Sequence, residues 1–253
     1  MTGPRLNIAW LYADLMSIYG DRGNVVCLVR RCQWRGIDVA VREIGIGDEL
    51  DPAEADLLFI GGAQDREQRL AADDLLARKA EPVREALASG ASALAVCGGY
   101  QLFGHEYRDA AGTVLRGIGV FDLVTEPAAP GARRIIGNVV ASPLLPGCED
   151  APNLVGFENH GGRTRLSVGA QPLGRVLHGG GNNGEDGFEG CVAGRAVGTY
   201  LHGSLLPKNP WLADWLLQAA LTRRHPGYEL PALDDTLELQ ARESAERRAY
   251  AAG

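Results

Sequence analysis

The chain has 253 residues, 45% hydrophobic and 23% charged, which is typical of a globular protein and excludes a disordered or fibrous one. Its formal net charge of −7 disfavours nonspecific binding to nucleic acid or to an anionic membrane surface. Five cysteines without a Cys-x-x-Cys spacing argue against a disulfide framework and a structural zinc site, so we expect a cytoplasmic chain without a metal. Neither a basic leader nor an apolar stretch of membrane-spanning length is present, so we expect no direct membrane insertion.

Short apolar strands and amphipathic helices alternate in the first 104 residues. Strands are predicted at residues 6–12, 38–44, 56–60 and 91–96. Helices are predicted at residues 23–35 and 65–89. This alternation predicts an α/β fold with a mostly parallel sheet and helices on both faces, and sites in such sheets lie beyond the carboxyl ends of the strands.

After Gly104 the pattern changes to short alternating segments between turn residues, which predicts an antiparallel extension. Further strands are predicted at residues 120–125, 135–142, 154–158 and 197–201. Residues 178–190 contain two dipeptides that favour tight turns, Asn183-Gly184 and Asp186-Gly187, and indicate a hairpin loop. A helix follows at residues 210–223. We expect one domain over residues 1–230 and a charged C-terminal tail, residues 231–253, that forms a solvated helix or a frayed end.

Cys97 follows a strand and precedes Gly98 and Gly99, an arrangement that predicts a nucleophile elbow. The glycines give room for the sharp turn, and the N–H groups that begin the next helix stabilise a thiolate and hold a developing oxyanion. The alternative is a buried structural cysteine, the interpretation that fits the remaining ones: Cys27, Cys32, Cys148 and Cys191.

A thiolate nucleophile needs a base, and histidine has a suitable pKa. Three of the five histidines have simpler explanations: His225 lies in a polar segment, His105 ends the helix after the elbow, and His178 belongs to the hairpin loop. His160 and His202 both lie where a strand meets a loop. The residues alone do not decide between these two.

Several segments resemble one enzyme family. The elbow at residues 97–101 and the segment at residues 198–203 resemble the nucleophile and base of class I glutamine amidotransferases, and residues 156–162 resemble their cobyric acid synthase-like branch. The matches to the GatD family, the glutaminase subunits of lipid II isoglutaminyl synthase, lie at residues 14–24, 61–65 and 182–187. This resemblance implies a three-layer, flavodoxin-like class I glutamine amidotransferase fold.

The resemblance also implies a reaction, the hydrolysis of L-glutamine through a cysteine thioester. Cys97 would be the nucleophile and His202 the base, with Gly62 and Gly98 supplying the N–H groups of the oxyanion hole. Gln101 would contact the substrate. Arg134, in preference to its neighbour Arg133, would bind the α-carboxylate of glutamine, since a guanidinium grips a carboxylate with two hydrogen bonds; the alternative for Arg134 is an ordinary surface arginine.

One position departs from the family pattern. Many class I members have a glutamate two residues after the catalytic histidine, where this chain has Ser204. Either another carboxylate orients His202, with Glu158 as the candidate, or the site is a dyad that a partner organises.

The released ammonia needs a consumer, and the sequence contains no Walker-type nucleotide motif. By resemblance the consumer is a Mur-ligase-like partner subunit, MurT, in a heterodimer. It would use ATP and Mg²⁺ to amidate D-glutamate to D-isoglutamine in lipid II during peptidoglycan synthesis, at the inner face of the membrane. This chain would need no cofactor of its own. The alternatives are a glutaminase for cobyrinate or other small-molecule amidation, and a catalytically silent scaffold.

Overall fold

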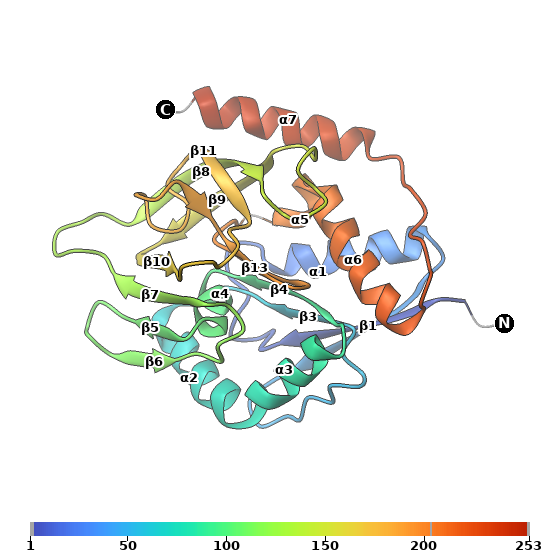
Figure 1. The fold of residues 1–253 in the computed structure, drawn as a ribbon, viewed down its shortest axis with the longest axis horizontal. Coiled ribbons are helices and arrows are strands. Elements are labelled where there is room, and N and C mark those ends of the chain that lie inside the picture. Colours follow the sequence, from blue (N-terminus) through green and yellow to red (C-terminus); the bar gives the residue numbers. More distant parts are fainter. Residues whose placement is uncertain (1–2, 203, 252–253) are drawn as a thin grey trace.

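The computed structural model describes residues 3–202 and 204–251, and its centre is a six-stranded sheet (Figure 1). All neighbouring strands in this sheet run parallel except the antiparallel pair at one edge. The strand order is β13 (Cys191–Ala193), β14 (Ala196–Thr199), β4 (Ser92–Val96), β3 (Leu57–Ile60), β1 (Arg5–Leu11) and β2 (Asp38–Ile44). The central strands β3 and β4 are buried along their whole length, as expected for a parallel sheet covered on both faces.

Helices cover both faces of this sheet (Figure 1). On one side α1 (Arg22–Trp34), α5 (Leu205–Lys208) and α6 (Pro210–Arg224) pack against one another. On the other lie α2 (Asp65–Asp74), the π-helical turn η1 (Leu75–Lys79) and α3 (Ala80–Ala88). The short helix α4 (Gly98–Phe103) follows β4. The predicted mostly parallel α/β fold is therefore confirmed, and up to Val96 the predicted ends agree to within one residue.

The predicted antiparallel extension consists of two separate four-stranded sheets, and the first of them contains one parallel pair, β5 with β7. The first has the order β10 (Gly162–Leu166), β7 (Leu123–Pro127), β5 (Glu106–Arg108) and β6 (Val114–Arg116). The second has the order β12 (Phe188–Glu189), β11 (Gly174–His178), β8 (Ile135–Pro143) and β9 (Leu154–His160). The strands that sequence reasoning missed have two to five residues, too short for a clear alternation of polar and apolar side chains.

The C-terminal tail forms the helix that was one of the two expectations, and it is not a frayed end; it is largely exposed but packs against the protein along one side. Helix α7 (Thr236–Ala251) contacts β8, β9 and α5, and its Ala249 is fully buried. Just before it, Asp235 binds the buried guanidinium of Arg31 at 2.6 Å, and Arg31 also binds Asp214 of α6. The division at residue 230 stays a prediction.

None of the helices within the described residues has both the length and the hydropathy that crossing a bilayer requires.

Candidate active site

Cys97 occupies a sharp turn between β4 and α4. Its φ of 51° and ψ of −104° lie in a region that a non-glycine residue adopts only when the surrounding structure imposes it. Its N–H donates to the carbonyl of Thr199 at the end of β14, over 2.8 Å. A Cβ on Gly99 would stand 2.8 Å from the carbonyl oxygen of Ile60, so this turn requires glycine. The predicted elbow geometry is present.

His202 lies beside Cys97 and is held by a carboxylate from a distant part of the chain. Its Nδ1 is 3.0 Å from Oδ1 of Asp21, and both side chains are fully buried. A Cβ on Gly62 would stand 2.8 Å from Cε1 of His202 and 3.3 Å from Cβ of Cys97, so imidazole and thiol flank the same glycine. Nε2 of His202 has no hydrogen-bond partner among the described residues. This nitrogen is therefore available for proton transfer.

The electrostatic surroundings of His202 favour its protonated form. Burial lowers its pKa, but the negative charge of the Cys97 thiolate and the hydrogen bond to Asp21 outweigh burial and raise the pKa to about 10. A histidine beside a cysteine is the arrangement that activates a cysteine nucleophile by accepting its proton.

Asp21 was not among the residues predicted from the sequence. It stands at the N-cap of α1, but its side chain makes no capping bond. Its second oxygen, Oδ2, instead accepts the N–H of Gly62 at 2.7 Å. The N–H of Gly62 is thus not free to hold an oxyanion, contrary to expectation. The next N–H, that of Ala63, has no acceptor in residues 3–202 and 204–251, and Ala63 lines the same cavity as Cys97.

Ser204 has a structural role in holding the loop that carries Asp21. Its hydroxyl donates to the carbonyl oxygen of Gly20 at 2.8 Å. Gly23 lies against the Ser204 side chain so closely that a Cβ there would clash with it. The orienting carboxylate therefore reaches His202 from α1, and the residue at position 204 supports that loop.

Glu158 does not contact His202. Its two oxygens accept the N–H groups of Gly180 and Gly181, at 2.7 and 2.9 Å. The hydrogen bond expected of Glu158 is made by Asp21 instead. Glu158 lies nearer to His160, whose Nε2 is 3.8 Å from it.

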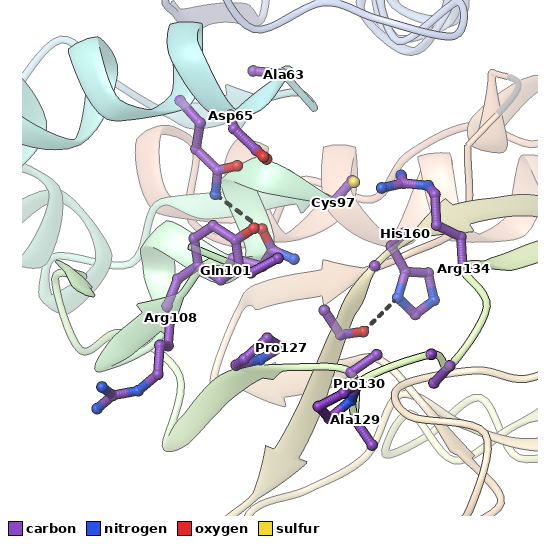
Figure 2. Close-up of a pocket in the computed structure, with 18 residues that line it drawn as sticks. Ala63, Asp65, Cys97, Gln101, Arg108, Pro127, Ala129, Pro130, Arg134 and His160 are labelled. Carbon is purple, nitrogen blue, oxygen red and sulfur yellow. Dashed lines mark hydrogen bonds between the residues drawn. The ribbon is translucent and has the colours of Figure 1, made fainter. Parts of the chain in front are cut away.

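A cavity of about 540 Å³ opens in front of Cys97 (Figure 2). Arg134 lines it, and its Nε and Nη2 donate to the side chain and backbone of Asn159 at 3.1 and 3.0 Å. Gln101 also lines it, with its amide held by Gln68 and by the hydroxyl of Tyr200. The cavity thus contains Arg134, Gln101 and the thiol together, whereas Arg133 is not among its lining residues.

Residues 7–210 match the model of the CobB/CobQ-like glutamine amidotransferase domain. The chain belongs to this family. It is 40% identical to the lipid II isoglutaminyl synthase (glutamine-hydrolyzing) subunit GatD of Staphylococcus aureus (strain N315), over 94% of this chain and 93% of that protein. The subunit of the same name from Streptococcus pneumoniae (strain ATCC BAA-255 / R6) is 38% identical over 92% of this chain and 87% of that protein. The resemblance stated from the motifs is confirmed.

Solved structures support the fold alone, because their sequence identity to this member of the family is low. A glutamine amidotransferase crystal structure has a TM-score of 0.56 at 16% identity and covers 84% of this chain and 98% of its own. The glutaminase domain of Trypanosoma brucei CTPS with bound acivicin has a TM-score of 0.54 at 12% identity and covers 89% and 96%. The predicted class I glutamine amidotransferase fold is confirmed.

Proposed function

We propose that this chain is a glutaminase subunit that hydrolyses L-glutamine and supplies the ammonia for amidation of lipid II. The observation that carries the proposal is the cluster of Cys97, His202 and Asp21, in which Cys97 lines the same cavity as Arg134. A strained nucleophile, a base with a free nitrogen and a carboxylate on the other nitrogen are the parts of acyl transfer from an amide.

The reaction follows from these positions. The Cys97 thiolate attacks the side-chain amide carbon of glutamine, and the N–H groups of Gly98 and Ala63 hold the oxyanion. Gly98 is the first residue of α4, where N–H groups have no acceptor within the helix. His202 gives its proton to the leaving nitrogen, which departs as ammonia and leaves a glutamyl thioester. His202 then takes a proton from water, and the hydroxide releases glutamate.

Asp21 has two tasks in this mechanism. It fixes the imidazole of His202 with Nε2 toward the reacting groups, and it stabilises the imidazolium. Through Gly62 it also fixes the loop that presents the N–H of Ala63. Arg134 binds the α-carboxylate of glutamine, and Gln101 contacts the substrate from the cavity wall.

The consumer of the ammonia is a Mur-ligase-like partner, MurT, in a heterodimer that acts at the cytoplasmic face of the membrane. It uses ATP and Mg²⁺ to amidate D-glutamate of lipid II to D-isoglutamine in peptidoglycan synthesis, and this chain needs no cofactor of its own. Support comes from the near full-length similarity to two relatives named as subunits of lipid II isoglutaminyl synthase. A cobyric acid synthase of Nocardia farcinica is 36% identical over 76% of this chain, but the match spans only 36% of that longer enzyme.

The test is amidation of lipid II by this chain co-purified with MurT, with glutamine and ATP. We expect a glutamine-dependent product that Cys97→Ala abolishes, while the same variant still supports amidation when ammonium chloride replaces glutamine. Amidation of a cobyrinate acceptor instead of lipid II would overturn the proposal that lipid II is the acceptor. Hydrolysis of glutamine by Cys97→Ala would overturn the mechanism, and a wild-type chain inactive on glutamine in every complex would favour the silent scaffold.

A further inference from the structure

Asp65 is a charged residue of the cavity that has no role in the proposed mechanism. It is the first residue of α2, it is exposed, and its side chain lines the cavity (Figure 2). Among the described residues its carboxylate makes neither a hydrogen bond nor an ion pair. The acidic residues that do pair nearby are Asp109, bound by Arg69, and Asp74, bound by Lys79. Asp65 is thus available to a cation in the cavity.

Asp65 and Arg134 approach Cys97 from different sides. In Figure 2, Asp65 lies on one side of the sulfur, at the start of α2, and Arg134 lies on the other, in the segment just before β8. Tyr107 lines the same cavity. Burial is the main reason that its pKa is raised, the charges of Asp65, Asp109 and Cys97 raise it further, and the charge of Arg134 lowers it. One cavity therefore places a negative and a positive group around the nucleophile.

We propose that Asp65 binds the α-ammonium group of glutamine while Arg134 binds its α-carboxylate. The inference rests on the proposed function and adds the residue that selects the amino end of the substrate. Free glutamine carries one positive and one negative group on its α-carbon, and a site with both opposite charges rejects amides that lack either one. A missing partner leaves a charged group of the site unpaired, which costs more than a lost neutral contact.

A competing explanation is that Asp65 only stabilises α2. Acidic residues in the first turn of a helix interact favourably with its dipole, and α2 has two of them, Asp65 and Glu67. Glu67 is the matched control, because it has the same charge in the same turn but is not among the cavity-lining residues.

The experiment measures kcat/KM for three amides with the MurT complex: L-glutamine, glutaramate, which lacks the α-ammonium, and 4-aminobutanamide, which lacks the α-carboxylate. We expect Asp65→Asn to lower kcat/KM for glutamine by about 10- to 100-fold, mainly through KM, and to change that for glutaramate by less than about 3-fold. Arg134→Ala should show the converse pattern, a loss for glutamine and little change for 4-aminobutanamide. Glu67→Gln should leave the preference for glutamine over both analogues intact.

The outcomes separate this inference from the proposed function. If Asp65→Asn lowers kcat/KM for glutamine and glutaramate equally, or leaves both unchanged, Asp65 does not bind the α-ammonium group. The same conclusion follows if Glu67→Gln reproduces the effect, since the cause is then the stability of α2 or the overall negative charge near its N-terminus. If the wild-type complex hydrolyses none of the three amides, it is the proposed function that fails.

Discussion

Two histidines lie at or just beyond the ends of strands, His160 as the last residue of β9 and His202 after β14, and each lies near a buried carboxylate. His202 shares a hydrogen bond with Asp21, and its Nε2 is free of partners among the described residues. The Nδ1 of His160 bonds instead to the carbonyl of Gly162, and its ring stacks on Tyr200 with a centroid separation of 3.6 Å. The Nε2 of His160 is equally without a hydrogen-bond partner among the described residues, and His160 lines the cavity, so the two rings differ in the partner of Nδ1: a carboxylate for His202 and a backbone carbonyl for His160.

The carboxylates differ in the same way. Asp21 joins His202 to the Gly62 loop, because one of its oxygens bonds to the imidazole and the other accepts the N–H of Gly62. Both oxygens of Glu158 accept backbone N–H groups of the hairpin loop, so Glu158 stabilises the conformation of that loop. The hydrogen bond to the ring is what distinguishes Asp21 from Glu158. The predictions that follow test this contrast and a third buried carboxylate, Glu189.

The largest effect is expected from removing the base. His202→Asn should lower kcat/KM for glutamine by at least about 10³-fold, because proton transfer at both steps is lost. His160→Asn should lower it by less than about 10-fold, through the lost stacking on Tyr200. Glutamate release over time measures both variants, and the reverse ranking would assign the base to His160.

Asp21→Asn should lower kcat by about 10²- to 10⁴-fold, since an amide does not stabilise the imidazolium. The carboxylate helps raise the pKa of His202 to about 10, so removing it lowers that pKa. The imidazolium that protonates the leaving ammonia disappears as pH rises through the pKa. The alkaline limb of the pH–rate profile should therefore move to lower pH in Asp21→Asn and stay in place in Glu158→Gln. An unmoved limb in Asp21→Asn would contradict the role of Asp21.

Glu189 supports the backbone that leads to His202, and its effect should depend on pH. The buried carboxyl accepts bonds from the hydroxyl of Thr199 and the N–H of Tyr200, at 2.5 and 2.9 Å. Burial raises its pKa from 4.5 to about 7 in the folded state, against the lowering effect of these bonds. Folding thus favours the protonated form of Glu189. The stability that this protonation contributes to the free energy of unfolding, roughly 3 kcal/mol, is lost as pH rises from about 4.5 through about 7.

Glu189→Gln removes this ionisation. The free energy of unfolding of the variant, relative to wild type, should therefore increase by roughly 3 kcal/mol between pH 4.5 and pH 8. Urea titrations at several pH values measure this difference, and the exposed Glu126→Gln serves as control. A constant difference across this range would mean that Glu189 is ionised throughout.

The smallest effect is expected from replacing Glu158, which stabilises the hairpin loop. Glu158→Gln keeps one carbonyl oxygen, so one of the two N–H groups at Gly180 and Gly181 loses its acceptor. We expect the free energy of unfolding to fall by about 1–3 kcal/mol, measured by urea denaturation. Loss of catalysis in a variant of wild-type stability would instead make Glu158 part of the reacting site.

The sequence alone was sufficient for the features that short stretches of chain determine. Strand and helix periodicity predicted the α/β order up to Val96, and the glycines after Cys97 predicted its turn. The turn dipeptides in residues 178–190 predicted a hairpin, and Gly184 and Gly187 have the positive φ values, 78° and 74°, that such turns need. The family motifs gave the expected nucleophile and base; the structure places Cys97 and His202 beside each other, and their roles stay predictions.

Tertiary structure decided which distant groups meet. Asp21 and His202 are 181 residues apart, and Asp21 looks in the sequence like an ordinary residue at the start of a helix. Its bond to Gly62 occupies the N–H that was expected to hold the oxyanion, and both oxygens of Glu158 accept backbone N–H groups and do not contact His202. The packing of α7 was equally hidden, because a charged helix docks through a few side chains such as Ala249. Local patterns fix the elements through short-range sterics and hydrogen bonds, whereas partners across the chain depend on how the strands are ordered in the sheet.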